Sequence, residues 1–361
     1  MKNIVDYIRS KGKENFERRS FNEVDSLVLS QLSYLNFEGL VPCFGSEGSP
    51  VTIAEIGRKA LREKLFIQSV GGGNNRKFFH ALETSKRFSD IALSDYINIV
   101  EQKSERQFSA ITCHLGQQTL YIAYRGTDQY LVSWKEDFNM MYKGPIPAQL
   151  DALQYLERIG ERFAGKIILG GHSKGGNLAV YSAIYCAKEI RERLEAIYNH
   201  DGPGLRTEVY QEEIYRQLKH KIQKTIPQTS FVGMLLYQQE EAKIIHSDAK
   251  GLLQHDPFSW RVEGTGFKVG HKLEKDALAA NAAIKKWLTE TDDEKRKIFV
   301  DTIYDILAGT GVFDIYEMRE KTFNKIAKML SLAKGIDEET RALIHGMIRA
   351  LLKNIMDAYR N

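Results

Sequence analysis

The sequence is poor in cysteine. Its three cysteines, Cys43, Cys113 and Cys186, are far apart and form no C-x-x-C pair, so a disulfide framework is not indicated. We interpret them as the reduced thiols of a cytoplasmic protein.

Long apolar runs and a strong excess of one charge are also missing. No stretch of about 18 apolar residues occurs, which argues against a transmembrane helix. The N-terminus has scattered charges where a secretory signal needs an apolar core, so export is not predicted. The net charge is only +4 and no basic run is interleaved with aromatic residues, so nucleic acid is not an expected partner.

The chain has enough residues for one large domain with an appendage. Hydrophobic residues make up 43% of the 361 positions and charged residues 27%, which are ordinary values for a globular protein. We predict an α/β domain with an N-terminal helical extension over 1–271 and a helical region over 272–361. The helical patterns of the second part cover 274–289, 293–308, 316–333 and 337–358. The apolar stripe of the last one is expected to pack on the fold, with a lid or a membrane-surface helix as the alternative.

The centre of the chain alternates strand and helix patterns, which is typical of a parallel sheet with crossover helices. Strands are predicted at 107–115 and 119–126 as a hairpin, then at 166–172, 195–200, 221–226, 231–237 and 242–247. Helices are predicted at 21–40, 52–68, 148–163 and 207–219. The glycine triplet at 71–73 lacks the Lys-Ser or Lys-Thr of a nucleotide loop, so we interpret it as a flexible surface loop.

The segment KIILGGHSKGGNLAVYSAIYCAKEI, residues 166–190, has the pattern of a buried strand, an abrupt turn and a helix, with Ser173 at the turn. Gly171 and Gly175 flank this serine by two residues on each side, where strand and helix approach most closely. Gly176 allows a further close approach. A serine nucleophile needs such an exposed corner beside a helix N-terminus, so Ser173 is the predicted nucleophile; a glycine-rich structural turn is the alternative.

The predicted base is His255, in a loop between two expected strands, with Pro257 stiffening the turn. His246 and His271 are reserves, and a surface histidine without a catalytic role is the alternative. His172 is the variable residue of the serine turn, and we expect its side chain to face packing neighbours.

The predicted acid is Asp201, because it ends a parallel strand at the same sheet edge as Ser173. A loop-capping Asx turn is the alternative role for Asp201. The competing carboxylates are those of Asp248, Asp256, Glu240 and Glu241.

Two groups are expected to stabilise an oxyanion. The backbone N–H of Lys174 follows from the turn geometry, and the RGTD loop offers the N–H or hydroxyl of Thr127. The alternative for that loop is a tight turn in which Arg125 pairs with a nearby acid.

The chain resembles the α/β-hydrolase superfamily in its class 3 lipase branch, through YRGTDQYLVSWKEDF followed some 30 residues later by GGHSKGG. With HDGPG, IPQTSFVGMLL and QHDPFSW it is most similar to the uncharacterised bacterial Mbeg-like family, over about 20–265. The resemblance implies Ser173 as nucleophile, Thr127 in the oxyanion loop and a late base matched to His255. It implies no acid, because Lys224 stands where the lipases carry aspartate in an Asp-x-Val-Pro segment.

The expected fold is therefore an α/β-hydrolase-type, mostly parallel sheet with flanking helices and a C-terminal helical appendage. The expected activity is that of a serine hydrolase, cleaving an ester or thioester of an acyl or lipid-like small molecule through an acyl-enzyme, with no metal or cofactor. The alternatives are a catalytically inactive hydrolase fold that binds a ligand or partner, and an amide hydrolase.

Overall fold

An eight-stranded sheet forms the centre of the structure, a computed structural model that describes residues 2–67, 72–128, 131–270 and 272–309, and 337–346 except 339 and 345. The strands lie in the sheet in the same order as in the chain. They are β1 (Val51–Thr52), β2 (Ala92–Glu101), β3 (Arg106–His114), β4 (Thr119–Tyr124), β5 (Lys166–His172), β6 (Leu194–His200), β7 (Ile222–Pro227) and β8 (Ala242–Ile245).

Two kinds of pairing make up this sheet. Strands β1 to β4 pair antiparallel, so the predicted β3–β4 hairpin is confirmed, and strands β4 to β8 pair parallel. The strand predicted at 231–237 is wrong. A short 3₁₀ helix, η4 (Val232–Met234), occurs there, because the chain turns tightly beside the end of β6: a Cβ on Gly233 would lie 2.2 Å from Asp201 Oδ1.

One face of the sheet is covered by the helices that connect its parallel strands. The parallel strands are added one after another in the same direction, so right-handed connections all cross the same face. These helices are α5 (Leu131–Asn139), α6 (Pro147–Arg162), α7 (Lys174–Tyr185), α8 (Lys188–Arg191) and α9 (Glu213–Leu218). The predicted helix at 207–219 is interrupted, since a 3₁₀ turn, η2 (Thr207–Gln211), precedes α9.

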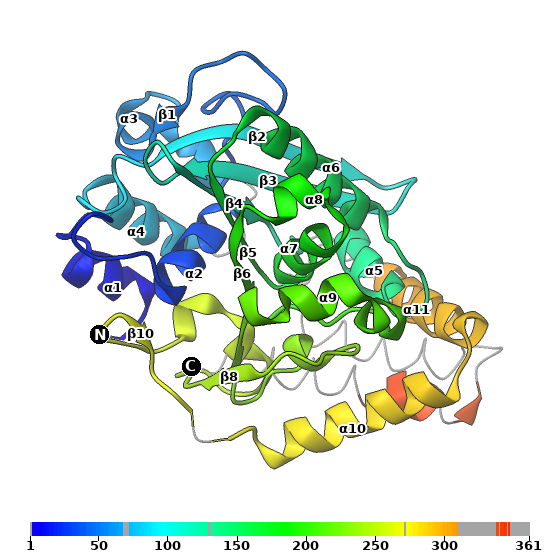
Figure 1. The fold of residues 1–361 in the computed structure, drawn as a ribbon. Coiled ribbons are helices and arrows are strands. Elements are labelled where there is room, and N and C mark those ends of the chain that lie inside the picture. The colour runs from blue at the N-terminus through cyan, green and yellow to red at the C-terminus, as the bar shows by residue number, and fades with distance from the viewer. Residues whose placement is uncertain are drawn as a thin grey trace.

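The opposite face is covered by N-terminal helices. These are α1 (Ile4–Lys11), α2 (Glu23–Leu32), α3 (Ile53–Arg58) and α4 (Gly72–Glu83), and the small hairpin of β9 (Val262–Glu263) and β10 (Gly266–Phe267) joins them. Strand β5 shows the division: Ile167 and Leu169 pack with the connecting helices, and Ile168 packs with the N-terminal ones. Figure 1 shows α1, α2 and α4 on one side of the sheet and α6, α7 and α9 on the other.

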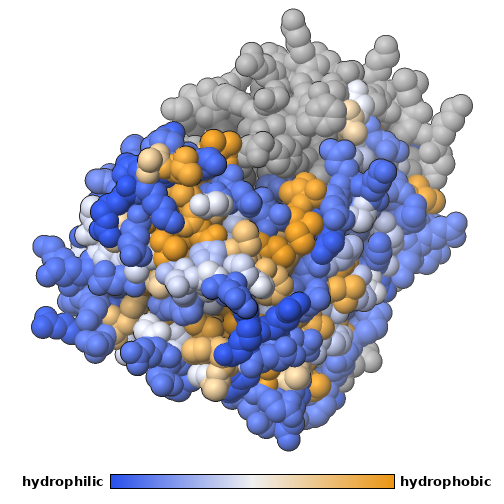
Figure 2. Space-filling view, turned by 90° about the horizontal axis from the view of Figure 1, so that it is seen from above, coloured by the Kyte–Doolittle hydropathy of each residue, from blue (hydrophilic) through white to orange (hydrophobic). Residues whose placement is uncertain are grey.

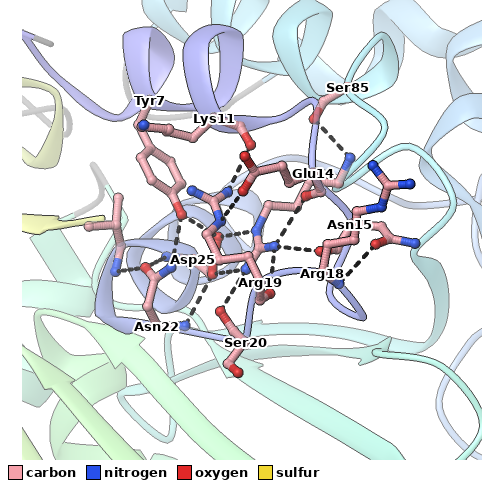
Figure 3. A network of polar contacts seen from close by, with 12 residues as sticks. Tyr7, Lys11, Glu14, Asn15, Arg18, Arg19, Ser20, Asn22, Asp25 and Ser85 are labelled. Carbon is pink, nitrogen blue, oxygen red and sulfur yellow. Dashed lines mark hydrogen bonds and ion pairs between the residues drawn. The ribbon is translucent and has the colours of Figure 1, made fainter. Parts of the chain in front are cut away.

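A buried polar network attaches the N-terminal segment to this face (Figure 3). Asn22 and Asp25 cap α2 in a reciprocal capping box. Asp25 also accepts hydrogen bonds from Tyr7 Oη at 2.9 Å and from Arg87 Nε at 2.8 Å. The segment before α2 is therefore part of the folded unit.

Two predictions for residues 52–83 are wrong in their details. The helix predicted at 52–68 is split into α3 and the 3₁₀ helix η1 (Arg62–Phe66), because Lys59 takes an extended conformation after α3. The glycines at 72 and 73 begin α4 instead of forming a surface loop, and Gly71 lies outside the described residues. Burial of Phe78, Phe79 and Leu82 in the core offsets the low helix propensity of those glycines.

The predicted C-terminal helices at 274–289 and 293–308 are observed as α10 (Lys275–Glu290) and α11 (Asp293–Ala308). Their buried side chains, including Trp287 and Phe299, belong to the same hydrophobic cluster as the connecting helices. The predicted helix at 316–333 and most of that at 337–358 lie outside the described residues. The division at 271/272 stays a prediction.

The surface seen from above Figure 1 has hydrophobic patches bordered by hydrophilic residues (Figure 2). Within the described ranges, no helix has both the length and the apolar character needed to cross a bilayer.

Candidate active site

Ser173 lies at the turn between β5 and α7, in the strand, turn and helix arrangement that the sequence predicts. Its backbone has φ +59° and ψ −135°, a conformation that residues other than glycine rarely adopt. The flanking glycines permit this corner. A Cβ on Gly171 would lie 2.2 Å from the carbonyl carbon of Gly175, and a Cβ on Gly175 would lie 2.1 Å from Tyr124 O.

The strained turn is held at the carboxyl edge of the parallel strands. The Ser173 N–H donates to His200 O at 2.9 Å, and a Cβ on Gly202 would lie 2.4 Å from Ser173 O. The end of β6 therefore packs directly against the turn. Ser173 itself is 7% exposed, so only a small part of it reaches solvent.

Asp201 and His255, predicted as acid and base from positions 54 residues apart, are brought together at this edge. His255 Nδ1 lies 2.7 Å from Asp201 Oδ2. Because a carboxylate can only accept, Nδ1 carries a proton, and in the neutral ring the lone pair is then on Nε2. Asp201 is fully buried, and the His255 side chain is 28% exposed. A ring with its proton on Nδ1 and a lone pair on Nε2 has the protonation pattern that a general base requires.

The carboxylate of Asp201 is fixed on its other side by Ser230, whose hydroxyl donates to Oδ1. Asp201 has φ +52°, so its backbone is also held in the left-handed region. Ser230 was not predicted from the sequence. The signal that points to it is its place just after β7, the strand that neighbours β6.

The competing carboxylates have other partners. Asp248 pairs with Arg261, and Asp256 accepts from Phe258 N at 3.0 Å to cap a 3₁₀ turn, η6 (Pro257–Ser259). Glu240 accepts from Tyr215 Oη at 2.8 Å, and Glu241 is exposed.

His246, a reserve base, pairs with another carboxylate: its Nε2 lies 3.7 Å from Asp248 Oδ1. His271, the other reserve, lies outside the described residues. Lys224, at the position where the lipases carry their acid, is buried in β7 and donates to Gln238.

The RGTD loop passes directly beside Ser173. A Cβ on Gly126 would lie 2.9 Å from Ser173 Cβ. The hydroxyl of Thr127 donates to Asp137 Oδ2, so its proton is engaged and the Thr127 N–H is the donor left for an oxyanion. The alternative role of the loop also has an observation behind it, because Arg125 Nη2 lies 3.6 Å from Asp128 Oδ2.

Lys174 is the first residue of α7, where backbone N–H groups have no partner within the helix. Its fully buried ammonium donates to Glu136 Oε2 at 2.8 Å and to Gln107 O at 2.9 Å. Burial alone would lower the Lys174 pKa, but the carboxylates of Glu136 and Asp137 raise it above its ordinary value. These two acids were not predicted from the sequence, although both stand in the SWKEDF segment next to the RGTD loop.

A cavity of about 460 Å³ opens near this edge, one turn of α7 from Ser173. Asn177 and Tyr181 of α7, Leu205, Arg206 and Leu236 are among the residues that line it. The described residues that line it do not include Ser173, Asp201 or His255. The three candidate residues therefore lie outside this cavity.

Among the described residues, no group of three or more His, Cys, Asp or Glu side chains is arranged to hold an ion. The candidate groups at this sheet edge are the Ser173 turn and the paired imidazole and carboxylate of His255 and Asp201.

The fold class is the predicted one: an α/β-hydrolase-type protein with helices on both faces of a sheet whose last five strands are parallel. A sequence model of the Mbeg1-like family matches residues 82–305. The match covers more than half of the chain, so the chain belongs to the Mbeg1-like family, as its motifs indicate.

The comparison with solved structures finds a distant similarity to a lipase, described as the crystal structure of M37 lipase. The identity is 15% and the TM-score 0.37, over 59% of this chain and 70% of that one. No curated protein matches the sequence.

Proposed function

We propose that this protein is a serine hydrolase that cleaves an ester or thioester through an acyl-enzyme. The observation that carries the proposal is the 2.7 Å contact between His255 Nδ1 and Asp201 Oδ2. It lies at the sheet edge where the strained turn presents Ser173. A nucleophile, a base with its lone pair free and a buried acid at one edge are the groups that acyl transfer needs.

In the acylation step, His255 Nε2 takes the proton of Ser173 Oγ while the oxygen attacks the acyl carbonyl carbon. The negative charge on the carbonyl oxygen is stabilised by the N–H groups of Lys174 and Thr127. The buried carboxylate of Asp201 stabilises the imidazolium that forms on His255.

The tetrahedral intermediate then collapses. The bond to the leaving oxygen or sulfur breaks, and His255 donates its proton to that atom. In the second half of the reaction, water loses a proton to His255 Nε2 and attacks the acyl carbon, releasing the acid and restoring Ser173. Every step uses side chains and backbone groups of this chain.

The proposed substrate is a small acyl ester, thioester or lipid-like molecule. Esters and thioesters suit the site because their leaving groups need less protonation by His255 than an amine does. Cytoplasmic location stays a prediction.

The test is covalent labelling of the full chain with a fluorophosphonate. We expect the wild type to label and Ser173→Ala not to label. His255→Ala is expected to slow labelling by about 100-fold or more, because it removes the general base. His246→Ala is the matched control, expected to label within about twofold of the wild type, since a surface substitution away from the site has little effect.

A folded wild-type chain that never labels would contradict the proposal and favour the binding-module alternative. Labelling that survives Ser173→Ala would place the nucleophile elsewhere. Hydrolysis rates on an ester and an amide with the same acyl group then separate an esterase from an amide hydrolase.

A further inference from the structure

His172 directly precedes Ser173, at the end of β5, and its imidazole packs against the ring of the proposed base. The two ring centroids, of His172 and His255, lie 4.5 Å apart with 34° between the ring planes. His172 is 5% exposed. The sequence predicted that this side chain faces packing neighbours, and the neighbour is His255.

His172 also contacts the backbone of the base. His172 Nε2 lies 2.8 Å from His255 O. A carbonyl oxygen can only accept, so Nε2 carries the proton and Nδ1 keeps the lone pair. Tyr34 Oη, 3.1 Å from Nδ1, is placed to donate to that lone pair. These contacts select one neutral tautomer.

The surroundings keep His172 uncharged. Burial, and then the nearby His255, hold the pKa of His172 well below its ordinary value. The titratable groups that face it are Tyr34 from the segment after α2, His200 from β6 and His255 from the loop after β8. A neutral ring beside His255 lets the base take up its proton during the reaction without repulsion from a second cation.

We propose that His172 is a positioning residue that docks the base His255 at a fixed place relative to Ser173, through its N–H bond to the His255 carbonyl and its ring contact. The inference rests on the proposed function, because it assigns a role in the same reaction. His172 and Ser173 are consecutive residues, so the distance between them varies little when other segments of the protein move.

The loop that carries His255 has supports of its own. Trp260 Nε1 donates to Gln254 O at 2.7 Å, and Thr229 N donates to Gln254 Oε1 at 2.7 Å. Both hold Gln254, one residue before the base. Loss of the His172 bond is therefore expected to loosen the placement of His255 while the loop stays folded.

The test compares two substitutions of the full-length protein in the rate of fluorophosphonate labelling. His172→Phe keeps a ring against His255 but has no N–H, and we expect it to slow labelling by about 10- to 100-fold, the usual cost of a misplaced catalytic group. His172→Gln keeps an amide N–H close to the place of Nε2, and we expect it to stay within about fivefold of the wild type.

Two further variants complete the set. His80→Gln, at an exposed position of α4 that pairs with Glu83, is the matched histidine control and is expected to change labelling less than about twofold. Tyr34→Phe removes one of the two contacts that select the tautomer and leaves the bond to His255 O, so a smaller slowing, of about 3- to 10-fold, is expected. Urea unfolding of each variant checks that the chain is folded.

A readout that does not depend on activity is the tautomer itself. Nitrogen-15 spectra of the histidine rings are expected to show, at neutral pH, a neutral ring with its proton on Nε2, and His172→Gln identifies the signal by its loss.

Three results would overturn the role of His172: wild-type labelling in folded His172→Phe, equal slowing in the Phe and Gln variants, or a His172 ring that is protonated at neutral pH. If His172→Phe does not fold, unchanged labelling in Tyr34→Phe overturns it. A wild-type chain that never labels counts against the proposed function, and the nitrogen-15 spectra still decide the docking.

Discussion

Among the described residues, two ion pairs have fully buried side chains but different surroundings. Arg87–Asp25 lies beside α2 on the N-terminal face, and Lys174–Glu136 lies between α7 and α5 near Ser173. Both bury opposite charges that would be costly alone. They differ in whether every buried carboxylate oxygen of the network accepts a hydrogen bond.

The Arg87 network is closed at its carboxylate, because both oxygens of Asp25 accept hydrogen bonds. The Arg87 guanidinium makes two of these bonds, at 2.8 and 2.5 Å. It donates further to the backbone carbonyls of Glu14, Asn15, Arg19 and Ser20. The ring of Phe16 lies 4.0 Å from the guanidinium carbon.

The Lys174 network is open at one end. Beyond Glu136 it reaches Asp137, whose Oδ1 lies 3.6 Å from the ammonium and accepts no hydrogen bond from the described residues. Burial raises the pKa of Asp137 to about 6, against the lowering effect of Lys174. The closed network contributes only to the stability of the fold. The open network also contacts, through Asp137, the Thr127 loop beside the candidate nucleophile.

The largest expected effect is that of Asp25→Ala. The substitution leaves the Arg87 guanidinium buried without its carboxylate partner, and this group cannot lose its proton. The free energy of unfolding should therefore fall by about 5 kcal/mol. Urea denaturation measures this loss. Fluorophosphonate labelling of the remaining folded chain should stay within about twofold of the wild type, because the pair lies on the N-terminal face. A selective loss of labelling would break the distinction between the two networks.

Lys174→Met should cost less stability but affect the site. The carboxylates left behind can take up protons, so the unfolding free energy should fall by about 3 kcal/mol. Labelling should slow by about 10-fold, because α5 no longer holds Asp137 and Thr127 in place. The labelling rate is measured by quenching the reaction of the folded variant at successive times. An unchanged labelling rate would reduce this network to a purely structural one.

Asp137→Asn tests the open end through pH. The native Asp137 binds its proton more tightly than the unfolded chain does, so its contribution to stability is largest below about pH 4 and declines as the pH rises to about 6. Relative to the wild type, the variant should gain about 2 kcal/mol between pH 4 and pH 7. Urea titrations of both proteins across this range provide the check, and parallel pH profiles would contradict the raised pKa.

Phe16→Leu has the smallest expected effect. It keeps apolar volume beneath Arg87 but removes the aromatic face, so the unfolding free energy should fall by about 1 kcal/mol. Thermal or urea unfolding resolves this difference. A loss as large as that of Asp25→Ala would mean that the ring, and not the carbonyl cage, keeps the guanidinium buried.

Much of the parallel half of the sheet was predictable because its signals are local. The apolar run before Ser173 and the glycines around it specify a strand and a tight turn, and Asp201 follows the next predicted strand. The prediction of a strand at 231–237 was wrong because an apolar segment next to Gly233 can also turn tightly over a neighbouring carboxylate. The surface loop predicted at the glycines of α4 was wrong because burial of later residues in that helix outweighed the low helix propensity of glycine.

The candidate site was predictable in its residue types but not in its supports. Ser173, His255 and Asp201 stand in recognisable motifs, and the structure brings the last two into contact. Ser230, Glu136 and Tyr34 act through contacts between distant segments, and no spacing in the chain indicates which segments meet. Their roles follow only from three-dimensional packing.

The one-sided arrangement of the connecting helices has a practical consequence for protein production. A fragment cut at the ends of the family match, 82–305, would lack α1, α2 and α3. The bare strands would then present Tyr121, Ile168 and Tyr198 to water and attract other copies of themselves. Expression trials should keep the first eighty residues, even though the shared family sequence begins after them.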